Sequence, residues 1–337
     1  TNRDEWVYDL DKKTLKQKSK FLSKIYNQSV KKQTLDLSIK WSENLKNHLE
    51  AKKKVRYLNK YIVISHYRPY TKMFFYANKT LNDRLTQNHY DFFGTDLKKE
   101  NICIWFKTGS EWPFFALATN IVHDHLPQGG SKTLPFYTYD ADGKRKENIT
   151  DWGLAQFTAH YKDTSITKLA IFHYTYAVLH YPQYKAKYEL NLKREFPHIP
   201  FYDDFQKWAA YGKALMNLHI EYETAEPYPL EQIDEELKKG SLIVAKLKVK
   251  KEEGIIVLDS KTELHGVPPQ AWAYRLGNRS ALEWVLDQYK EKKIRDKTLR
   301  EQFDTYRFAA YKTQVIDLLK RVCTVSVETM KIFGEMK

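Results

Sequence analysis

The stretch FQKWAAYGKALMNLHIEY, residues 205–222, decides the fold because its apolar side chains recur at steps of three and four residues. The members of this stripe are Phe205, Trp208, Ala209, Gly212, Leu215, Met216, His219 and Tyr222. Such spacing places them on one face of a helix, and the large aromatic members indicate that this face is buried. We expect His219, inside the stripe, to be a hydrogen-bonded core histidine.

On the C-terminal side of this helix the pattern changes to that of a β-hairpin. Apolar residues alternate with lysines over residues 245–250, which is typical of a half-exposed strand. Glu253-Gly254 then predicts a turn into the apolar run IIVL at 255–258. After Pro268-Pro269 the sequence is mainly helical. In GNRSALEW, Ser280 and Glu283 have the spacing of a helix capping box.

On the N-terminal side, residues 61–122 contain the β-rich runs YIVIS, MFFYAN, NICIWF and PFFALATNIV, separated by Pro and Gly. The run FYTYDADGKRK predicts a hairpin whose turn uses Asp142-Gly143. The first 55 residues have helical stripes. The sequence therefore predicts a mixed α+β fold with a helical linker (1–55), a β-rich subdomain (56–150), and a mainly helical subdomain (151–337) with a hairpin near 242–258.

Composition indicates a basic, globular protein. The 337 residues carry 56 Lys and Arg against 42 Asp and Glu, a net charge of +14, and 15% of them are aromatic. Residues 1–60 alone hold 16 basic and 7 acidic side chains. Such a field attracts polyanions such as nucleic acid, although a solvated lysine surface has the same composition. No apolar run approaches the ~20 residues that cross a bilayer, no signal peptide is evident, and only two Cys are present. We therefore expect a cytoplasmic protein with no membrane partner.

The search for catalytic and metal-binding motifs predicts neither kind of site. The sequence contains no GxGxxG, no GxxxxGK[ST] and no GxSxG. His123 and His125 have no third ligand nearby at zinc-site spacing. The run GGSKT at 129–133 lacks the upstream glycine of a phosphate loop, so we expect a simple turn. We interpret Cys323, among valines, as an inert buried thiol.

Basic and amide side chains interleaved with aromatics point instead to DNA binding. Arg and Lys can donate to guanine edges, and Asn and Gln can pair with adenine. Three basic residues at a hairpin tip suit phosphate contacts. Arg279 could meet either a phosphate or a carboxylate of the fold, and we favour the carboxylate. The candidate DNA-binding residues are Arg68, Lys72, Asn78, Lys79, Asn82, Arg84, Gln87, Asn88, Lys132, Lys144, Arg145, Lys146 and Arg279.

Several long stretches resemble a known family, the single-chain type ISP restriction–modification enzymes. TNRDEWVYD at 1–9 is similar to the segment that follows their methyltransferase core. AVLHYPQYKAKYELNLKREFPHIPF at 177–201, continued by GKALMNLHIEYE at 212–223, resembles a signature of the family. GVPPQAWAYRLGNRSALEWVLDQY at 266–289 and VCTVSVETMKI at 322–332 resemble two more.

The resemblance implies that the chain is the sequence-specific DNA target-recognition region of an enzyme that methylates adenine and cleaves unmodified DNA. It implies double-stranded DNA and the methyltransferase domain of the same polypeptide as partners. S-adenosylmethionine, ATP and Mg are then expected only in the parent enzyme's other domains, with no cofactor and no catalysis in this chain. Two alternatives remain open: a structural or protein-interaction domain of a DNA-processing assembly, and an independent nuclease or other enzyme.

Overall fold

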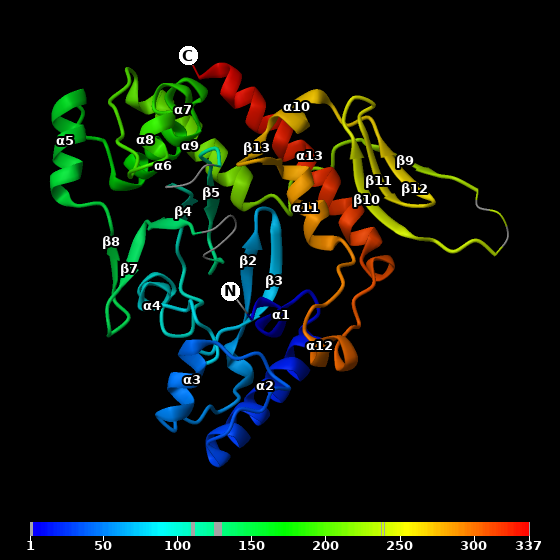
Figure 1. Cartoon of the computed structure of the whole chain (residues 1–337). Coiled ribbons are helices and arrows are strands. Elements are labelled where there is room, and N and C mark those ends of the chain that lie inside the picture. The colour runs from blue at the N-terminus through cyan, green and yellow to red at the C-terminus, as the bar shows by residue number, and fades with distance from the viewer. Residues whose placement is uncertain (1–2, 109–111, 125–129, 237, 239, 337) are drawn as a thin grey trace.

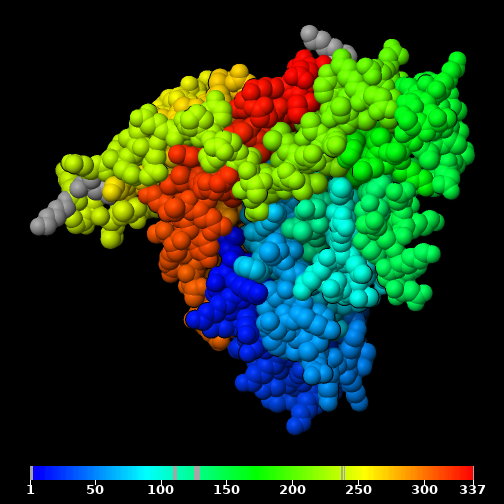
Figure 2. All heavy atoms as spheres, turned by 180° about the vertical axis from the view of Figure 1, so that it is seen from behind, coloured from blue at the N-terminus to red at the C-terminus, as the bar shows by residue number. Residues whose placement is uncertain are grey.

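The computed structural model describes residues 3–108, 112–124, 130–236, 238 and 240–336. The N-terminal helices lie at one end of the molecule, small β-sheets occupy its middle, and helices of the C-terminal half cover the other end (Figure 1). A four-stranded sheet projects from the body as an arm, which the view from behind also shows (Figure 2). This is the mixed α+β fold that the sequence predicts.

The N-terminal segment is helical as predicted, but it also contributes a short strand to a sheet. Tyr8 and Asp9 pair with Phe75 and Phe74, which gives an antiparallel sheet of order β1-β3-β2. The helices pack on this sheet around one apolar cluster. The boundaries at residues 55 and 150 stay predictions about folding units. The elements here are α1 (Asp4–Val7), β1 (Tyr8–Asp9), α2 (Lys12–Lys32), α3 (Glu43–Glu50), the 3-10 turn Asn59–Tyr61, β2 (Ile62–Arg68) and β3 (Thr71–Tyr76).

The rest of the β-rich region consists of a three-stranded sheet, a hairpin and one short helix. The sheet has the order β5-β4-β6, with every residue of β4 and β5 buried. The hairpin turns at Asp142-Gly143, as predicted, with Gly143 at φ +76°. These elements are α4 (Gln87–Phe93), β4 (Cys103–Phe106), β5 (Ala116–Thr119), β6 (Lys132–Pro135), β7 (Tyr137–Tyr139) and β8 (Arg145–Glu147).

The predicted buried helix is α9 (Phe205–Ile220), and it packs closely along α6 (Lys168–His180). Asp204 caps the start of α9 by accepting a hydrogen bond from the Lys207 amide at 3.1 Å. Gly212 allows the close approach of the two helices, since a Cβ at this position would lie 1.7 Å from the carbonyl oxygen of His173. The neighbouring helices are α5 (Asp151–Tyr161), α7 (Pro182–Lys187) and α8 (Glu189–Leu192).

The projecting arm is a four-stranded antiparallel sheet of order β10-β11-β12-β9, which includes the predicted hairpin. Helix α11 starts with the expected capping box, in which the Ser280 amide donates to Glu283 Oε2 at 2.9 Å. The elements are β9 (Glu231–Asp234), β10 (Ala245–Lys250), β11 (Ile255–Asp259), β12 (Thr262–His265), α10 (Pro269–Ala273), β13 (Arg275–Leu276), β14 (Arg279–Ser280), α11 (Ala281–Tyr289), α12 (Lys297–Gln302), the 3-10 turn Phe308–Ala310 and α13 (Lys312–Glu335).

A buried hydrogen-bond network around His219 joins the helical half to the β-rich half. Tyr176 accepts a hydrogen bond from the Ala118 amide at 2.8 Å, so its hydroxyl proton is free to be donated to His219 Nδ1 at 2.6 Å. The proton of the neutral ring is therefore assigned to Nε2, which lies 2.9 Å from Thr329 Oγ1 and 3.2 Å from the Tyr274 hydroxyl. His219 is the core histidine that the sequence predicts.

The network continues from Tyr274 to the tip of the β2–β3 hairpin. The hydroxyls of Tyr274 and Tyr70 lie 2.9 Å apart, and both side chains are buried. Tyr70 has a left-handed backbone conformation, with φ +56°, which is uncommon for a residue with a side chain. The hairpin tip is thus held inside the core of the C-terminal half.

Along the part of the chain that the structure describes, no helix is both long enough and apolar enough to span a lipid bilayer.

Gly212→Ala should destabilise the protein by about 3 kcal/mol or more, because the new methyl group overlaps a backbone oxygen that cannot rotate away. Gly334→Ala in α13 is the matched control, since a Cβ there meets no atom within 4 Å. The control should leave stability unchanged or raise it by up to about 1 kcal/mol. Urea unfolding of both variants measures the difference, and equal stabilities would contradict the close contact.

The protein should lose stability as the pH falls below about 6.5, because it buries neutral histidines. Burial lowers the pKa of His66 and of His180 to about 3, and it lowers the pKa of His219 well below its usual range. The unfolded chain therefore binds protons first, and each of these histidines costs up to about 2 kcal/mol by pH 5. Denaturant unfolding between pH 7.5 and 5 tests this. A free energy of unfolding that stays constant over this range would contradict it.

Candidate nucleic-acid interface

One surface gathers most of the exposed polar side chains that the sequence proposes as DNA ligands. It comprises the loop 77–86, helix α4, the start of β6 and the hairpin β7–β8, and we call it the recognition face. Helix α4 contacts β7, so the hairpin lies beside the helix (Figure 1). The proposed ligands with exposed side chains are Lys79, Arg84, Gln87, Asn88, Lys132, Lys144, Arg145 and Lys146.

The loop 77–86 is held by hydrogen bonds from buried side chains. Asn78 Oδ1 accepts from the amides of residues 80 and 81 at 3.0 and 3.1 Å. Asn82 Nδ2 donates at 2.8 Å to the carbonyl oxygens of Tyr76 and Asn78. Leu81 and Leu85 are buried in the cluster beneath the loop. These contacts fix the backbone, so its exposed side chains start from a defined position.

A buried arginine near the N-terminus supports the same loop from below. The Arg3 guanidinium donates to the Leu81 carbonyl oxygen at 3.2 Å, to Ser42 Oγ at 2.8 Å and to Asp83 Oδ1 at 2.5 Å. Its side chain is only 1% exposed. A buried charge is tolerated only when it is paired and hydrogen-bonded, so this contact strongly constrains the loop.

Helix α4 presents two amide side chains at its exposed start. The Thr86 amide donates to His89 Nδ1 at 3.2 Å, which satisfies the backbone just before the first turn. Gln87 and Asn88 occupy this first turn and are exposed. Gln87 Nε2 donates to Asp91 Oδ1 at 3.0 Å. The Asn88 side chain makes no such hydrogen bond to the described residues.

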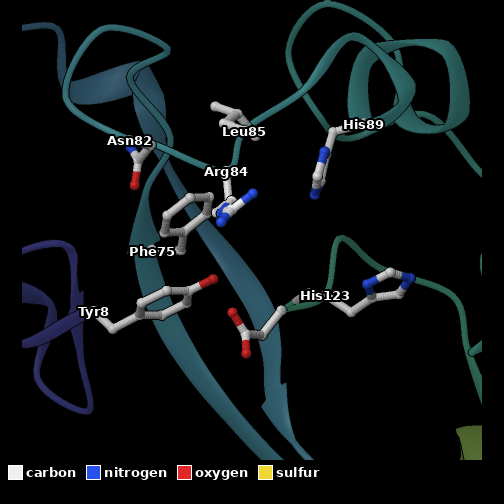
Figure 3. Close-up of a pocket in the computed structure, with 8 residues that line it drawn as sticks. Tyr8, Phe75, Asn82, Arg84, Leu85, His89 and His123 are labelled. Atoms are coloured by element: carbon white, nitrogen blue, oxygen red, sulfur yellow. The ribbon is translucent and has the colours of Figure 1, made fainter. Parts of the chain in front are cut away.

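Arg84 lies at a small hollow between the loop and α4. Figure 3 shows its guanidinium beside the Phe75 ring, with Tyr8, His89 and His123 around the hollow. The hollow has a volume of about 20 Å³, which holds about one water molecule and no ligand. Because the Arg84 side chain is exposed, its donors remain available to a partner outside the protein.

A larger groove adjoins this hollow, runs along α4 and brings in strand β6. It has a volume of about 270 Å³, and Asn88, Phe92, Lys132, Thr133 and Phe196 are among its lining residues. Lys132 is thus placed next to Asn88 although the two are far apart in sequence. The Asn88 amide and the Lys132 ammonium group therefore belong to the lining of one groove.

The β7–β8 hairpin carries the three basic residues predicted at its tip. Asp140 Oδ1 accepts from the Lys144 amide at 2.8 Å, which fixes the turn. The Arg145 guanidinium stacks 4.1 Å from the Tyr137 ring centroid and lies 3.5 Å from Glu100 Oε2. Lys144 and Lys146 are exposed, and neither forms an ion pair with another residue of the described part of the chain. Their positions suit contacts with phosphates.

The Arg68 guanidinium is held inside the fold by two carboxylates and an aromatic ring. Its Nη1 lies 2.5 Å from Asp124 Oδ2, its Nη2 lies 3.7 Å from Asp4, and its guanidinium covers the Tyr67 ring at 3.9 Å. Asn78 and Asn82 are likewise committed to the loop backbone. The polar atoms of these three residues thus already have partners within the fold, and their assignment to DNA binding stays a prediction.

Lys72 and Arg279 are engaged in ion pairs at the surface. Lys72 Nζ lies 2.6 Å from Glu223 Oε2, and Arg279 Nη1 lies 2.9 Å from Asp287 Oδ2. Arg279 also covers the Trp284 ring at 5.1 Å. The carboxylate partner that we favour for Arg279 is therefore present.

Sequence reasoning missed a second group of basic residues. Lys53, Lys54 and Arg56 follow α3 and, together with Lys79, line a cleft next to α4. We call it the basic cleft. The signal was present in the sequence, since residues 52–60 carry five basic side chains and no acidic one. The predicted boundary at residue 55 divided this group, because it put Lys53 and Lys54 in the linker and Arg56 in the β-rich subdomain.

No group of three His, Cys, Asp or Glu side chains is placed to hold a metal ion among the residues that the structure describes. His123 stacks on Trp105 and lies 3.0 Å from Thr133 Oγ1, while His125 and Gly129 fall outside the described residues. Cys323 is buried, and burial raises its pKa to about 12, as expected for an inert thiol.

Comparison with solved structures supports the resemblance seen in the sequence. The chain is 43% identical to DrdV in a cryo-EM structure of a DrdV–DNA complex, with a TM-score of 0.96 over 100% of this chain and 35% of that one. It is 25% identical to a nuclease-deletion mutant of the Type ISP restriction–modification enzyme LlaGI in complex with a DNA substrate mimic, with a TM-score of 0.80 over 99% of this chain and 32% of that one.

A third structure shares the fold: LlaBIII, an ATP-dependent Type ISP restriction–modification enzyme bound to DNA, with 24% identity and a TM-score of 0.84 over 99% of this chain and 22% of that one. The chain thus spans about a third or less of the length of these proteins. No curated protein matches its sequence. The family model of the Type ISP C-terminal specificity domain matches residues 1–318, and the chain therefore belongs to this family.

Proposed function

We propose that this chain recognises a specific base sequence in double-stranded DNA for a restriction–modification enzyme and leaves catalysis to other domains. The observation that carries the proposal is the recognition face, where Arg84, Gln87 and Asn88 project from a backbone fixed by buried contacts. The chain belongs to a family of specificity domains, and its solved relatives are bound to DNA or a DNA mimic. Both facts support the proposal.

The three exposed side chains have the chemistry of direct base readout. An arginine can donate two hydrogen bonds to the O6 and N7 atoms of guanine, and an asparagine or glutamine can pair with the N6 and N7 atoms of adenine. Gln87 would exchange its contact with Asp91 for such a pair. A fixed backbone favours this readout because less conformational freedom is lost on binding.

The exposed lysines around these residues have the chemistry of phosphate contacts. Lys132 lines the groove beside α4, and Lys144 and Lys146 extend from the adjacent hairpin. A lysine ammonium is a flexible point charge that attracts phosphate without distinguishing bases. We infer that these residues orient the duplex against the recognition face.

The parent enzyme supplies the rest of the proposed activity. The family resemblance supports an adenine methyltransferase in the same polypeptide, as well as helicase-like ATPase and nuclease modules. S-adenosylmethionine, ATP and Mg would bind to those parts. We propose that this chain itself takes no cofactor, that it docks on the methyltransferase domain, and that it works in the cytoplasm.

DNA affinity should fall steeply with salt, because the proposed contacts to about five phosphates release bound counterions. The logarithm of affinity should decrease with the logarithm of salt concentration at a slope of about −4 to −5. Fluorescence anisotropy with a labelled duplex at several salt concentrations measures the slope. A slope near zero would refute the electrostatic contribution, and an absence of DNA binding would favour a protein-interaction domain instead.

Arg84→Ala or Asn88→Ala should weaken binding to the recognised site by about 1–3 kcal/mol while binding to a scrambled duplex hardly changes. Lys144→Ala is the control and should weaken both about equally, because a phosphate contact carries no sequence information. The site is first selected from a randomised duplex library, and competition binding then compares it with its scrambled version. If Arg84→Ala and Asn88→Ala weakened binding to both duplexes equally, these residues would contact phosphates and not bases.

A further inference from the structure

The basic cleft is an open cavity whose cations form no ion pair with any residue that the structure describes. It has a volume of about 380 Å³ and is bordered by the segment 53–56, the start of the loop after β3, and the segment that follows α4. Its cationic lining consists of Lys53, Lys54, Arg56 and Lys79, and none of these side chains forms an ion pair in the structure. Among the described residues that line it, Asp96 is the single carboxylate.

The backbone that carries three of these cations is fixed by helix α2. The Tyr26 hydroxyl donates to the Lys53 carbonyl oxygen at 2.7 Å. Asn27 bonds both polar groups of Val55, accepting from its amide at 2.9 Å and donating to its carbonyl oxygen at 2.7 Å. Val55 itself is buried. The segment is therefore anchored from within while its charged side chains remain exposed.

A second cleft of similar size shows that this lack of pairing is not general. The cleft between β10 and α11 has a volume of about 370 Å³ and is lined by Lys248, Arg279 and Lys290 among others. Here Arg279 pairs with Asp287 at 2.9 Å, and the lining residue Glu283 pairs with Lys251 at 2.8 Å. The described lining of this second cleft has two carboxylates for three cations. That of the basic cleft has one carboxylate for four cations, and therefore the larger excess of positive charge.

We propose that the basic cleft binds the phosphodiester backbone of the DNA that flanks the recognised bases. Three extended residues span about 10 Å, so the cations between Lys53 and Arg56 can meet more than one phosphate. Tyr90 of α4 lines this cleft and Asn88 lines the groove across the helix, so the cleft and the recognition face share one helix, which is about 10 Å wide. The inference rests on the proposed DNA recognition and adds a contact outside the recognised sequence.

The test compares two triple variants that each remove three positive charges. Lys53→Gln/Lys54→Gln/Arg56→Gln changes the basic cleft, and Lys246→Gln/Lys248→Gln/Lys290→Gln changes the distant arm and its cleft. Binding is measured with the selected site and with its scrambled duplex over a range of salt. The cleft variant should bind both duplexes about tenfold or more weakly, with a salt slope reduced in size by about 2 to 3. The arm variant should bind within about twofold of the unchanged protein.

Shortening the duplex tests the location of the contact. Trimming the DNA flank on one side should weaken binding by the unchanged protein about as much as the cleft substitutions do, and the cleft variant should lose little further affinity on the trimmed duplex. Additive losses would overturn the proposal. So would an unchanged salt slope, or a loss confined to the recognised site.

Two controls separate this proposal from a folding defect and from the proposed function. Lys53→Arg/Lys54→Arg/Arg56→Lys keeps the charges and should retain binding, whereas a loss equal to that of the glutamine variant would show a structural role and overturn the proposal. If the cleft variant binds normally while Arg84→Ala loses sequence preference, the cleft proposal fails and DNA recognition stands. If the unchanged protein binds no duplex, the proposed function itself fails.

Discussion

A neutral His219 lies where the two halves of the molecule pack together. Its Nδ1 accepts from the Tyr176 hydroxyl, so a second ring proton would put a charge on a buried ring and remove the acceptor of that hydroxyl proton. The other nitrogen faces Thr329 of α13 and the Tyr274 hydroxyl. Through Tyr274 the same network reaches Tyr70, which extends from the β-rich half. One neutral imidazole therefore connects α9, α6, α13 and the β2–β3 hairpin.

The anchored hairpin in turn positions the recognition face. Strand β3 starts just after Tyr70 and leads directly into the loop 77–86, so the loop begins at a point that the core has already fixed. Buried hydrogen bonds from Arg3, Asn78 and Asn82 then fix the backbone of this loop. Such contacts are costly to break because each would leave a buried polar group unpaired. The buried hydrogen bonds beneath the face therefore fix the backbone from which its exposed side chains project.

Local patterns predicted the elements well, and they failed where a side chain's partner is distant in sequence. The stripe from Phe205 to His219, the Asp142-Gly143 turn and the Ser280–Glu283 cap each involve neighbours a few residues apart, so spacing alone was sufficient. Arg68 pairs with Asp124, 56 positions away, and Arg3 pairs with Asp83, 80 positions away. No local pattern distinguishes such an arginine from one that faces solvent. The cations at 53–56 are neighbours in sequence, but the cleft was missed because Lys79 joins them only in the folded chain.

Inward and outward residues alternate through the loop and the start of α4. Leu81, Asn82 and Leu85 face the interior, while Arg84 and Asn88 face outward. Substitutions at the inward positions would leave cavities or unpaired buried groups, whereas substitutions at the outward positions should cost little stability. If Arg84 and Asn88 read bases as we propose, a new target sequence would not require a new core, and the same scaffold could evolve different specificities.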